Sequence, residues 1–453
     1  MSSRYNPPSV SDTAYDATAW DGVTSIGPSK NVVRDKLENI AASTVPVVNV
    51  KGYGAVGDGV TDDTPAIQTL IDTVPVPTVI YFPVGVYIVS GLKLKSNMTL
   101  RGAGSGGFGL SSFWDTRCSV LRHKAGSTLP LIGDYATGSL TYSIVIEDLQ
   151  LDGNKANQTT GLHGVQLYDA ASGQDPAWTI DRCLIRNCKG DGINQGTFRR
   201  GLHVFNTHID QCDGHGIQLN ATDNAVAFCF INRCSGVGID ITKSTQHLTS
   251  NDVFGCLIGL RTSGGVHAVM VVSCVFDLNM NQGALLAGAR TALIGCRFAS
   301  NSTSGNGAYA HIDFDFPNTV ALSCSVIGCI VEWEAASTPN KASYGILTNV
   351  EVSIHGLMFN RSTLPFTTGS VNTSALSMLM TTSQAISDGL NLSLGATSGT
   401  KIGTATTQKL GFYNATPVVQ GASVADATDA ATAITQLNAL ISRIEALGLI
   451  ATV

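Results

Sequence analysis

The chain has 453 residues, of which 43% are hydrophobic and 13% are charged, and its formal net charge at pH 7 is −6. A chain of this length and apolar content can bury an extended core. The negative charge argues against a nucleic-acid partner, because phosphate binding needs a basic surface. We find no signal-peptide pattern and no run near the ~18 apolar residues of a membrane span, so we expect a soluble protein without membrane insertion.

Residues 1–46 are polar and differ in composition from the sequence that follows. Within them, residues 29–40 predict a short amphipathic helix with Val32, Val33, Leu37 and Ile40 on one side. A helix this short cannot form a core by itself. We therefore expect an appended segment before the main folded region.

Ten of the eleven cysteines fall into two columns that share one period. The columns lie two residues before and three residues after the reference positions Leu151, Ile185, Ile209, Ile231, Val253, Phe276, Phe298, Val326 and Leu357. The steps between these positions are 34, 24, 22, 22, 23, 22, 28 and 31 residues. A unit of 22 to 24 residues therefore recurs, and three units carry insertions, which is typical of a solenoid.

The first column contains Leu149, Cys183, Thr207, Cys229, Asn251, Cys274, Cys296, Cys324 and His355, and the second contains Asn154, Cys188, Cys212, Cys234, Cys256, Asn279, Asn301, Cys329 and Asn360. Short β-branched runs bounded by Gly, Asn and Asp surround them and predict strands and turns. A 22-residue unit would close a circuit of roughly 70 Å, so the sequence predicts a parallel β-helix.

Both columns are expected to lie inside the β-helix. Cysteine is a small apolar filler, and a buried Asn can hydrogen-bond to the main chain of its own coil and the next. Metal binding or disulfides are the alternatives, but paired CxxC knuckles are missing. We therefore expect no metal, no cofactor and reduced thiols, as in a protein assembled in a cytoplasm.

Three stretches carry a family resemblance: GYGAVGDGVTDDTPAIQ (residues 52–68), VIYFPVGVYIVS (79–90) and MTLRGAG (98–104). Together they resemble the opening signature of the pectate-lyase-like superfamily of right-handed parallel β-helix proteins. Thr61 or Asp62 would cap a helix that carries Ala66, Ile67, Leu70 and Ile71. We expect that helix to close the amino-terminal end of an otherwise exposed solenoid core.

The two ends of the chain resemble parts of bacteriophage tail proteins. Residues 14–40 resemble their amino-terminal segments, and residues 398–420 resemble carboxy-terminal segments of tail fibres. In residues 426–447, a seam of apolar residues with heptad spacing favours a coiled coil of more than two helices. A helix lying on the protein's own surface would show the same pattern. The seam consists of Ile434, Leu437, Ile441 and Ile444.

The expected fold class is all-β, a right-handed parallel β-helix with a short helical amino-terminal segment and a carboxy-terminal trimerisation helix. The expected parts are a virion-anchoring segment (1–46), the β-helix (47–369), a small β-rich region (370–420) and the terminal helix (421–453). The resemblance implies a homotrimeric phage tail spike or tail fibre in the virion tail, assembled in the host cytoplasm. Its amino terminus would dock on other tail or baseplate proteins.

Two acidic pairs have the spacing of a glycosidase site. Asp313 with Asp315, and Glu332 with Glu334, would each share one face of a strand at roughly 6.6 Å, and two carboxylates that flank a glycosidic bond can hydrolyse it. Tyr168 and Trp178, in an earlier insertion, could stack on sugar rings. The alternative is that these acidic residues mark a solvated strand face.

A second candidate catalytic pair is Asp191 in GDGINQG and His215 in DGHGIQL. Stacked coils would bring the two together, in an arrangement that resembles polygalacturonases but departs from them in the coils on either side. Outward positions on the same face, Asn194, Gln218 and Asp240, would form a polar strip that binds glycan hydroxyls.

The sequence thus predicts recognition of a bacterial surface polysaccharide, with hydrolysis of that glycan left open. Two alternatives remain. The chain could be a non-catalytic receptor-binding or structural fibre, or a free-standing pectinase-like hydrolase or lyase.

Overall fold

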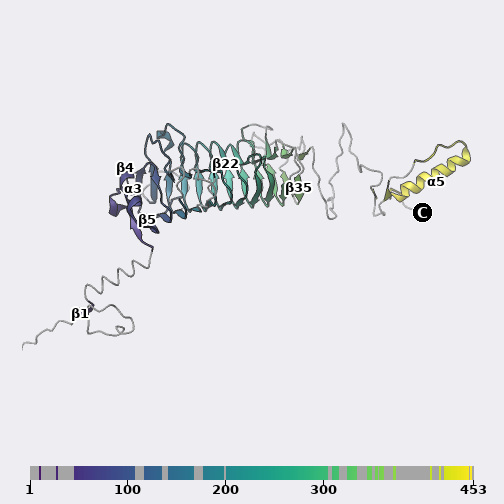
Figure 1. The fold of residues 1–453 in the computed structure, drawn as a ribbon. Helices are drawn as coiled ribbons and strands as arrows, with labels where there is room; N and C mark the ends of the chain where they lie inside the picture. Colours follow the sequence, from purple (N-terminus) through teal and green to yellow (C-terminus); the bar gives the residue numbers. More distant parts are fainter. Residues whose placement is uncertain are drawn as a thin grey trace, which may run out of the picture. The chain divides into compact units, whose positions relative to one another are not determined.

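The computed structural model describes residues 10–11, 27–28, 45–107, 117–134, 141–167, 177–197, 200–304, 309–315, 324–333, 344–348, 352–355, 357–361, 371–373, 409–410, 418–419, 423–447 and 449–450. The chain divides into two units, residues 1–379 and 380–453. The first contains a stack of parallel strands and the second contains one long helix (Figure 1).

Three parallel sheets, here named sheets I, II and III, form the stack, and each coil from β5 onwards contributes one strand to each sheet. Sheet I contains β7 (Leu92–Lys93), β10 (Ile132–Asp134), β13 (Val165–Leu167), β16 (Ile193–Gln195), β19 (Ile217–Leu219), β22 (Val237–Ile241), β25 (Ile258–Thr262), β28 (Ala284–Leu286), β31 (Ala310–Phe314), β34 (Tyr344–Thr348) and β37 (Val371–Thr373).

Sheet II contains β3 (Val47–Asn49), β5 (Thr78–Phe82), β8 (Met98–Gly102), β11 (Ile144–Glu147), β14 (Trp178–Asp181), β17 (His203–Phe205), β20 (Asn224–Ala227), β23 (Gln246–Thr249), β26 (His267–Val272), β29 (Ala289–Ile294), β32 (Cys324–Ile327) and β35 (Val352–His355). Sheet III contains β4 (Asp58–Asp62), β6 (Gly85–Val89), β9 (Ser119–His123), β12 (Gln150–Asp152), β15 (Leu184–Arg186), β18 (His208–Asp210), β21 (Phe230–Asn232), β24 (Asp252–Phe254), β27 (Val275–Asp277), β30 (Arg297–Ala299), β33 (Ile330–Trp333) and β36 (Met358–Arg361). The predicted right-handed parallel β-helix is confirmed.

The corner between sheets II and III is a very short turn whose first residue adopts a left-handed conformation. Its φ angle is 47° at Asn206, 56° at Phe228 and 52° at Ser250. This conformation costs a residue with a side chain about 1–2 kcal/mol. Each of these residues also donates its N–H to a carbonyl oxygen of the next coil at 2.9–3.1 Å, and this bond offsets part of that cost.

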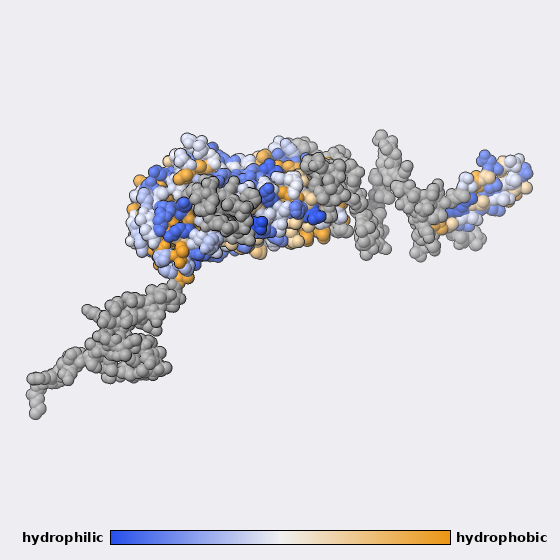
Figure 2. All heavy atoms as spheres, viewed as in Figure 1, coloured by the Kyte–Doolittle hydropathy of each residue, from blue (hydrophilic) through white to orange (hydrophobic). Residues whose placement is uncertain are grey.

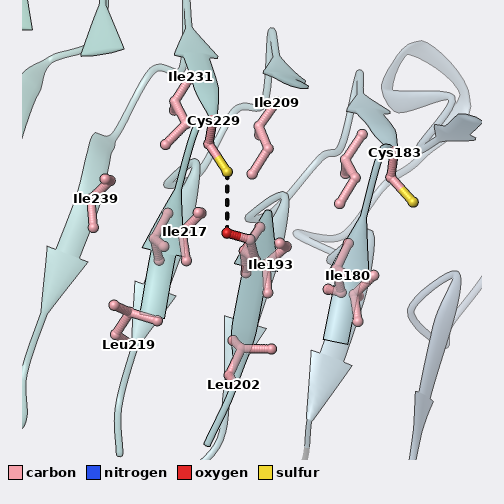
Figure 3. Close-up of a cluster of buried hydrophobic side chains, with 14 of the residues drawn as sticks. Ile180, Cys183, Ile193, Leu202, Ile209, Ile217, Leu219, Cys229, Ile231 and Ile239 are labelled. Atoms are coloured by element: carbon pink, nitrogen blue, oxygen red, sulfur yellow. Dashed lines mark hydrogen bonds between the residues drawn. The ribbon is translucent and has the colours of Figure 1, made fainter. Parts of the chain in front are cut away.

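The predicted thiol columns lie in the core. All eleven cysteines are buried and none forms a disulfide bond. Figure 3 shows Cys183 and Cys229 among the aliphatic side chains of successive coils, with a hydrogen bond of 3.4 Å from Cys229 Sγ to the Val204 carbonyl oxygen. Burial raises the pKa of Cys183 to about 12, so this thiol stays protonated at neutral pH.

The buried asparagines also behave as predicted. Asn279 Nδ2 donates to Asn301 Oδ1 at 2.9 Å, and Asn301 Nδ2 donates to the Phe276 carbonyl oxygen at 3.0 Å. The amide hydrogen of Cys256 is accepted by Asn279 Oδ1 at 3.1 Å. Each amide thus satisfies main-chain groups that the tight bend leaves without a partner, which is why Asn can replace Cys in this column.

The predicted register is wrong in the last two units. Phe298 pairs with Val331, and Val331 pairs with Phe359, so the true reference positions are Val331 and Phe359 rather than Val326 and Leu357. Cys329 therefore belongs to the first column and lies next to Cys296. Cys324 lies in sheet II instead, while His355 and Asn360 leave their predicted columns. The insertions in these coils obscured the period.

The amino-terminal end of the core is covered by α3 (Thr64–Thr73), which buries Ile67, Leu70 and Ile71 as predicted. The cap differs by one or two residues, since Asp63 rather than Thr61 or Asp62 occupies the N-cap position. Asp63 Oδ1 and Oδ2 accept hydrogen bonds from the Val56 and Gly57 amides. Asp63 thus ties the preceding loop to the helix start. There are also two short 3₁₀ helices, η1 (Val50–Tyr53) after β3 and η2 (Lys155–Asn157) after β12.

The second unit contains α5 (Ala430–Ala446), which starts with a capping box between Asp429 and Thr432. Three seam residues are exposed, Ile434 at 65%, Leu437 at 56% and Ile441 at 36%, and hydrophobic side chains are visible among polar ones on this helix (Figure 2). Among the described residues, no helix combines the length and apolar character needed to cross a bilayer.

The remaining strands are two short pairs, β1 (Val10–Ser11) with β2 (Gly27–Pro28) and β38 (Lys409–Leu410) with β39 (Val418–Val419). The helix predicted for residues 29–40 lies outside the described residues, as do Tyr168 and Glu334. The domain boundaries stay predictions.

Candidate functional site

A continuous row of side-chain positions runs along the outer face of sheet I. Seven residues occupy equivalent positions in neighbouring strands: Gln166, Asn194, Gln218, Asp240, Arg261, Leu285 and Asp313. Residues on either side of Asn194 and Gln218 are buried, as expected for strands whose side chains alternate between core and surface. We call these seven positions the sheet-I row.

Hydrogen bonds link the middle of the sheet-I row. Asn194 Nδ2 donates to Gln218 Oε1 at 2.7 Å, and Gln218 Nε2 donates to Asp240 Oδ2 at 3.3 Å. Arg261 donates to both oxygens of Asp240, from Nε at 2.8 Å and from Nη2 at 2.9 Å. The structure thus brings Asn194, Gln218 and Asp240 together as the sequence indicated, and adds Arg261, which the sequence analysis missed.

Asp191 lies beside this row, in the turn that precedes β16. Its carboxylate accepts hydrogen bonds from Asn194 Nδ2 at 2.6 Å and from the His215 main-chain N–H at 2.7 Å. His163 Nδ1 lies 3.2 Å from Asp191 Oδ2. Burial raises the pKa of Asp191, but the interactions with His163, Asn194 and His215 outweigh it and leave that pKa below its ordinary value. Asp191 is therefore a carboxylate fixed in its ionised form.

His215 meets Asp191 through its backbone rather than its ring. Its Nδ1 accepts a hydrogen bond of 2.9 Å from the Val237 main-chain N–H, so the neutral ring carries its proton on Nε2. Nε2 lies 3.8 Å from Asp240 Oδ2, beyond hydrogen-bond distance. The predicted Asp191–His215 contact exists, but it is made by the main chain, and Nδ1 of the ring is already engaged as a hydrogen-bond acceptor. The cluster is suited to holding hydroxyl groups.

His163 was also missed by the sequence analysis, although a signal was present. His163, Asp191 and His215 each precede a glycine that comes directly before a sheet-I strand, in HGV, DGI and HGI. Aligning that glycine from coil to coil would have placed all three residues in one column.

The pair Asp313 and Asp315 lies at the other end of the row. Asp313 is partly buried and accepts a hydrogen bond of 3.1 Å from Gln282 Nε2, while Asp315 is exposed. Burial is the main cause that raises the pKa of Asp313; the charge of Asp315 adds to it and the Gln282 bond opposes it. A carboxyl group with a raised pKa beside a second carboxylate is the arrangement that a general acid needs.

Glu332 lies on sheet III, not on the face that carries Asp313. Arg297 Nε and Nη2 both lie 2.7 Å from Glu332 Oε2. This ion pair indicates a structural role for Glu332. Among the described residues, no group of three or more His, Cys, Asp or Glu side chains could hold a metal ion.

The expectation for Trp178 is wrong. Trp178 is 0% exposed and donates from Nε1 to the Thr141 carbonyl oxygen at 3.3 Å. It starts β14, where the alternation of side chains points it into the core with Ile180. It therefore cannot stack on a bound sugar.

Comparisons with known proteins agree with this architecture. A family model described as "Rhamnogalacturonase A/epimerase, pectate lyase-like" matches residues 47–283, more than half of the chain. Mannuronan C5-epimerase AlgE1 from Azotobacter vinelandii is 31% identical over 227 residues, covering 45% of this chain and 15% of the epimerase. Depolymerase 1 of Klebsiella phage K5-2, described as capsule K30/K69-specific, is 24% identical over 315 residues, covering 65% of this chain and 38% of the depolymerase.

Among solved structures, the full-length tailspike protein 2 from Escherichia coli O157:H7 bacteriophage CAB120 superposes with a TM-score of 0.55 at 14% identity, covering 69% of this chain and 42% of the tailspike. The chain spans well under half the length of each of these three proteins, and the structural match is one of fold. The stack of coils has the same parallel β-helix fold as this tailspike, and the chain belongs to the rhamnogalacturonase A/epimerase, pectate lyase-like family.

Proposed function

We propose that the chain is a tailspike-type protein that binds a bacterial surface polysaccharide along the sheet-I row and hydrolyses it beside Asp313. The observation that carries the proposal is the row itself. Five strand-to-strand steps of about 4.8 Å separate Asn194 from Asp313, so this part of the row spans roughly 24 Å along the axis of the β-helix. That length suits several consecutive units of an extended sugar chain.

In this proposal the two ends of the row have different tasks. The amides of Asn194 and Gln218 and the fixed carboxylate of Asp191 bind sugar hydroxyls, because together they offer both donors and acceptors. Asp313, with its raised pKa, protonates the leaving oxygen, and Asp315 acts as the second carboxylate.

The test is depolymerisation of host capsule or lipopolysaccharide, measured by size-exclusion chromatography and by release of reducing ends. Asp313→Asn should abolish cleavage while polysaccharide binding persists. Asp252→Asn, an exposed Asp on sheet III, is the matched control and should leave cleavage unchanged. Cleavage should also fall as pH rises through the pKa of Asp313, because the protonated acid is the active form. Full activity in Asp313→Asn would refute the assignment.

A second candidate is a receptor-binding spike that does not cut. The observation in its favour is that both carboxylate oxygens of Asp191 and of Asp240 already accept a hydrogen bond from a neighbouring group. Under this alternative, purified protein binds the polysaccharide but releases no reducing ends. Unsaturated products would instead indicate a lyase, in line with the pectinase-like alternative.

The virion-tail location, attachment to other tail proteins through residues 1–46 and assembly as a homotrimer belong to the same proposal. The phage depolymerase and the tailspike among the similar proteins support it. So do the exposed seam residues of α5, which leave an apolar stripe for partner helices. Sedimentation should give the mass of three chains, and Leu437→Ser with Ile441→Ser should reduce it. A wild-type monomer would contradict the trimer.

A further inference from the structure

A cleft of about 800 Å³ lies on sheet III, away from the sheet-I row. It is lined by the strands β4, β6, β9, β12 and β15 and by the turn that contains η2. The charged residues that line it are Asp62, Arg122, Lys124, Asp152, Lys155 and Arg186. Four cationic side chains thus face two carboxylates. We call this feature the sheet-III cleft.

Three of the four cations form hydrogen-bonded ion pairs. Lys124 Nζ lies 2.8 Å from Asp62 Oδ2, and Arg122 Nε lies 3.3 Å from Asp152 Oδ2. Lys155 Nζ lies 2.9 Å from Asp213 Oδ1, a carboxylate outside the cleft lining. Both carboxylates of the cleft therefore already have a cationic partner, and Asp152 is shared, because its Oδ2 also lies 3.7 Å from Arg186 Nη2.

Arg186 is that fourth cation, and its guanidinium is incompletely satisfied. The residue is only 6% exposed, and its Nε and Nη2 are buried without a hydrogen-bond partner. The nearest carboxylate oxygen, Asp152 Oδ2, lies 3.7 Å from Nη2, beyond hydrogen-bond distance. A buried guanidinium whose Nε and Nη2 lack hydrogen-bond acceptors is unfavourable. An anionic group that enters the cleft would therefore gain an unusually strong interaction.

We infer that the sheet-III cleft binds a carboxylate of an acidic sugar unit in the polysaccharide, at a subsite separate from the sheet-I row. A carboxylate matches the planar fork of a guanidinium, which donates two parallel hydrogen bonds to it. Lys124 and Lys155 on the cleft wall add long-range attraction for a polyanionic chain. The inference rests on the proposed function, because it takes the polysaccharide as the source of the carboxylate.

The experiment is isothermal titration calorimetry of the full chain with galacturonate, glucuronate and mannuronate tetrasaccharides. Their methyl esters serve as neutral analogues and inorganic phosphate as the simple anion. At least one acidic tetrasaccharide should bind, its methyl ester should bind at least ten-fold more weakly, and Arg186→Met should cause a similar loss. Thermal denaturation checks that the variant is folded.

A matched lysine pair keeps the inference testable even if Arg186→Met fails to fold. Lys155 and Lys189 both pair with Asp213, but only Lys155 lines the cleft. Lys155→Gln should weaken binding of the acidic tetrasaccharide several-fold and Lys189→Gln should not.

Four results would overturn the inference: none of the acidic tetrasaccharides binds, the methyl ester binds equally, phosphate binds as tightly as the tetrasaccharide, or a folded Arg186→Met variant keeps full affinity. Failure of the sheet-I mechanism is visible separately, because it is read from cleavage that survives in Asp313→Asn, whereas the cleft is read from tetrasaccharide binding by Arg186→Met and Lys155→Gln.

Discussion

Replacing Asp240 with Asn should destabilise the β-helix, because it removes the ion pair with Arg261. Asp240 is 1% exposed and receives two hydrogen bonds from Arg261 and one from Gln218. An Asn side chain has nearly the same volume, but its NH₂ group would face donors that now meet an acceptor. The change therefore tests the charge and the hydrogen bonds without creating a cavity.

The expected magnitude follows from the unequal burial of the two partners. Removing one partner of a buried ion pair costs about 3–5 kcal/mol when the other charge stays buried. The Arg261 side chain is 37% exposed and can turn towards water, whereas Asp240 cannot. We therefore expect Asp240→Asn to lower the free energy of unfolding by about 2–3 kcal/mol, in the range for lost charge-assisted hydrogen bonds. Arg261→Met should cost more, about 3–5 kcal/mol.

The assay is urea unfolding followed by circular dichroism, with all variants at one protein concentration so that any oligomer equilibrium is matched. The double variant Asp240→Asn with Arg261→Met should cost less than the sum of the single changes. If each single variant lowers the free energy of unfolding by less than about 0.5 kcal/mol, the Asp240–Arg261 pair behaves like a solvent-exposed salt bridge. A larger cost for Asp240→Asn than for Arg261→Met would refute the argument from unequal burial.

Three further predictions concern the core and the Asp191 cluster. Asn279→Leu should lower the free energy of unfolding by about 1–3 kcal/mol for each buried polar group that loses its partner, including the Cys256 N–H. An unchanged urea midpoint would contradict this prediction. In the native protein none of the eleven buried cysteines should react with a thiol reagent within minutes, whereas all should react in denaturant; rapid native labelling would argue against the packed columns. The pKa of Asp191 is lowered from 3.8, so its ionised form stabilises the folded state above pH 3.8, and this contribution is lost as pH falls through the pKa of the folded state. Asp191→Asn should therefore flatten the acid side of the curve of unfolding free energy against pH. An unchanged curve would count against the Asp191 cluster.

The β-helix could be predicted from the sequence because equivalent positions of stacked coils share one environment. Cys188, Cys212 and Cys234 recur at a nearly constant interval, since each occupies the same buried corner and the same small volume. The polar strip of Asn194, Gln218 and Asp240 could be found for the same reason: a strand alternates between core and surface, so a constant period also aligns outward residues.

Tertiary structure alone decided what the period does not encode. Insertions obscured the strand register around Val331 in the sequence. Side-chain direction was also undetermined, because a shift of one residue along a strand moves a side chain such as Trp178 from the surface to the core. Charge partners are even harder to predict from sequence. Arg186 and Asp152 are 34 residues apart, and the distance of 3.7 Å between Arg186 Nη2 and Asp152 Oδ2 is too long for a hydrogen bond. Such differences depend on how coils of unequal length stack, which only the folded chain determines.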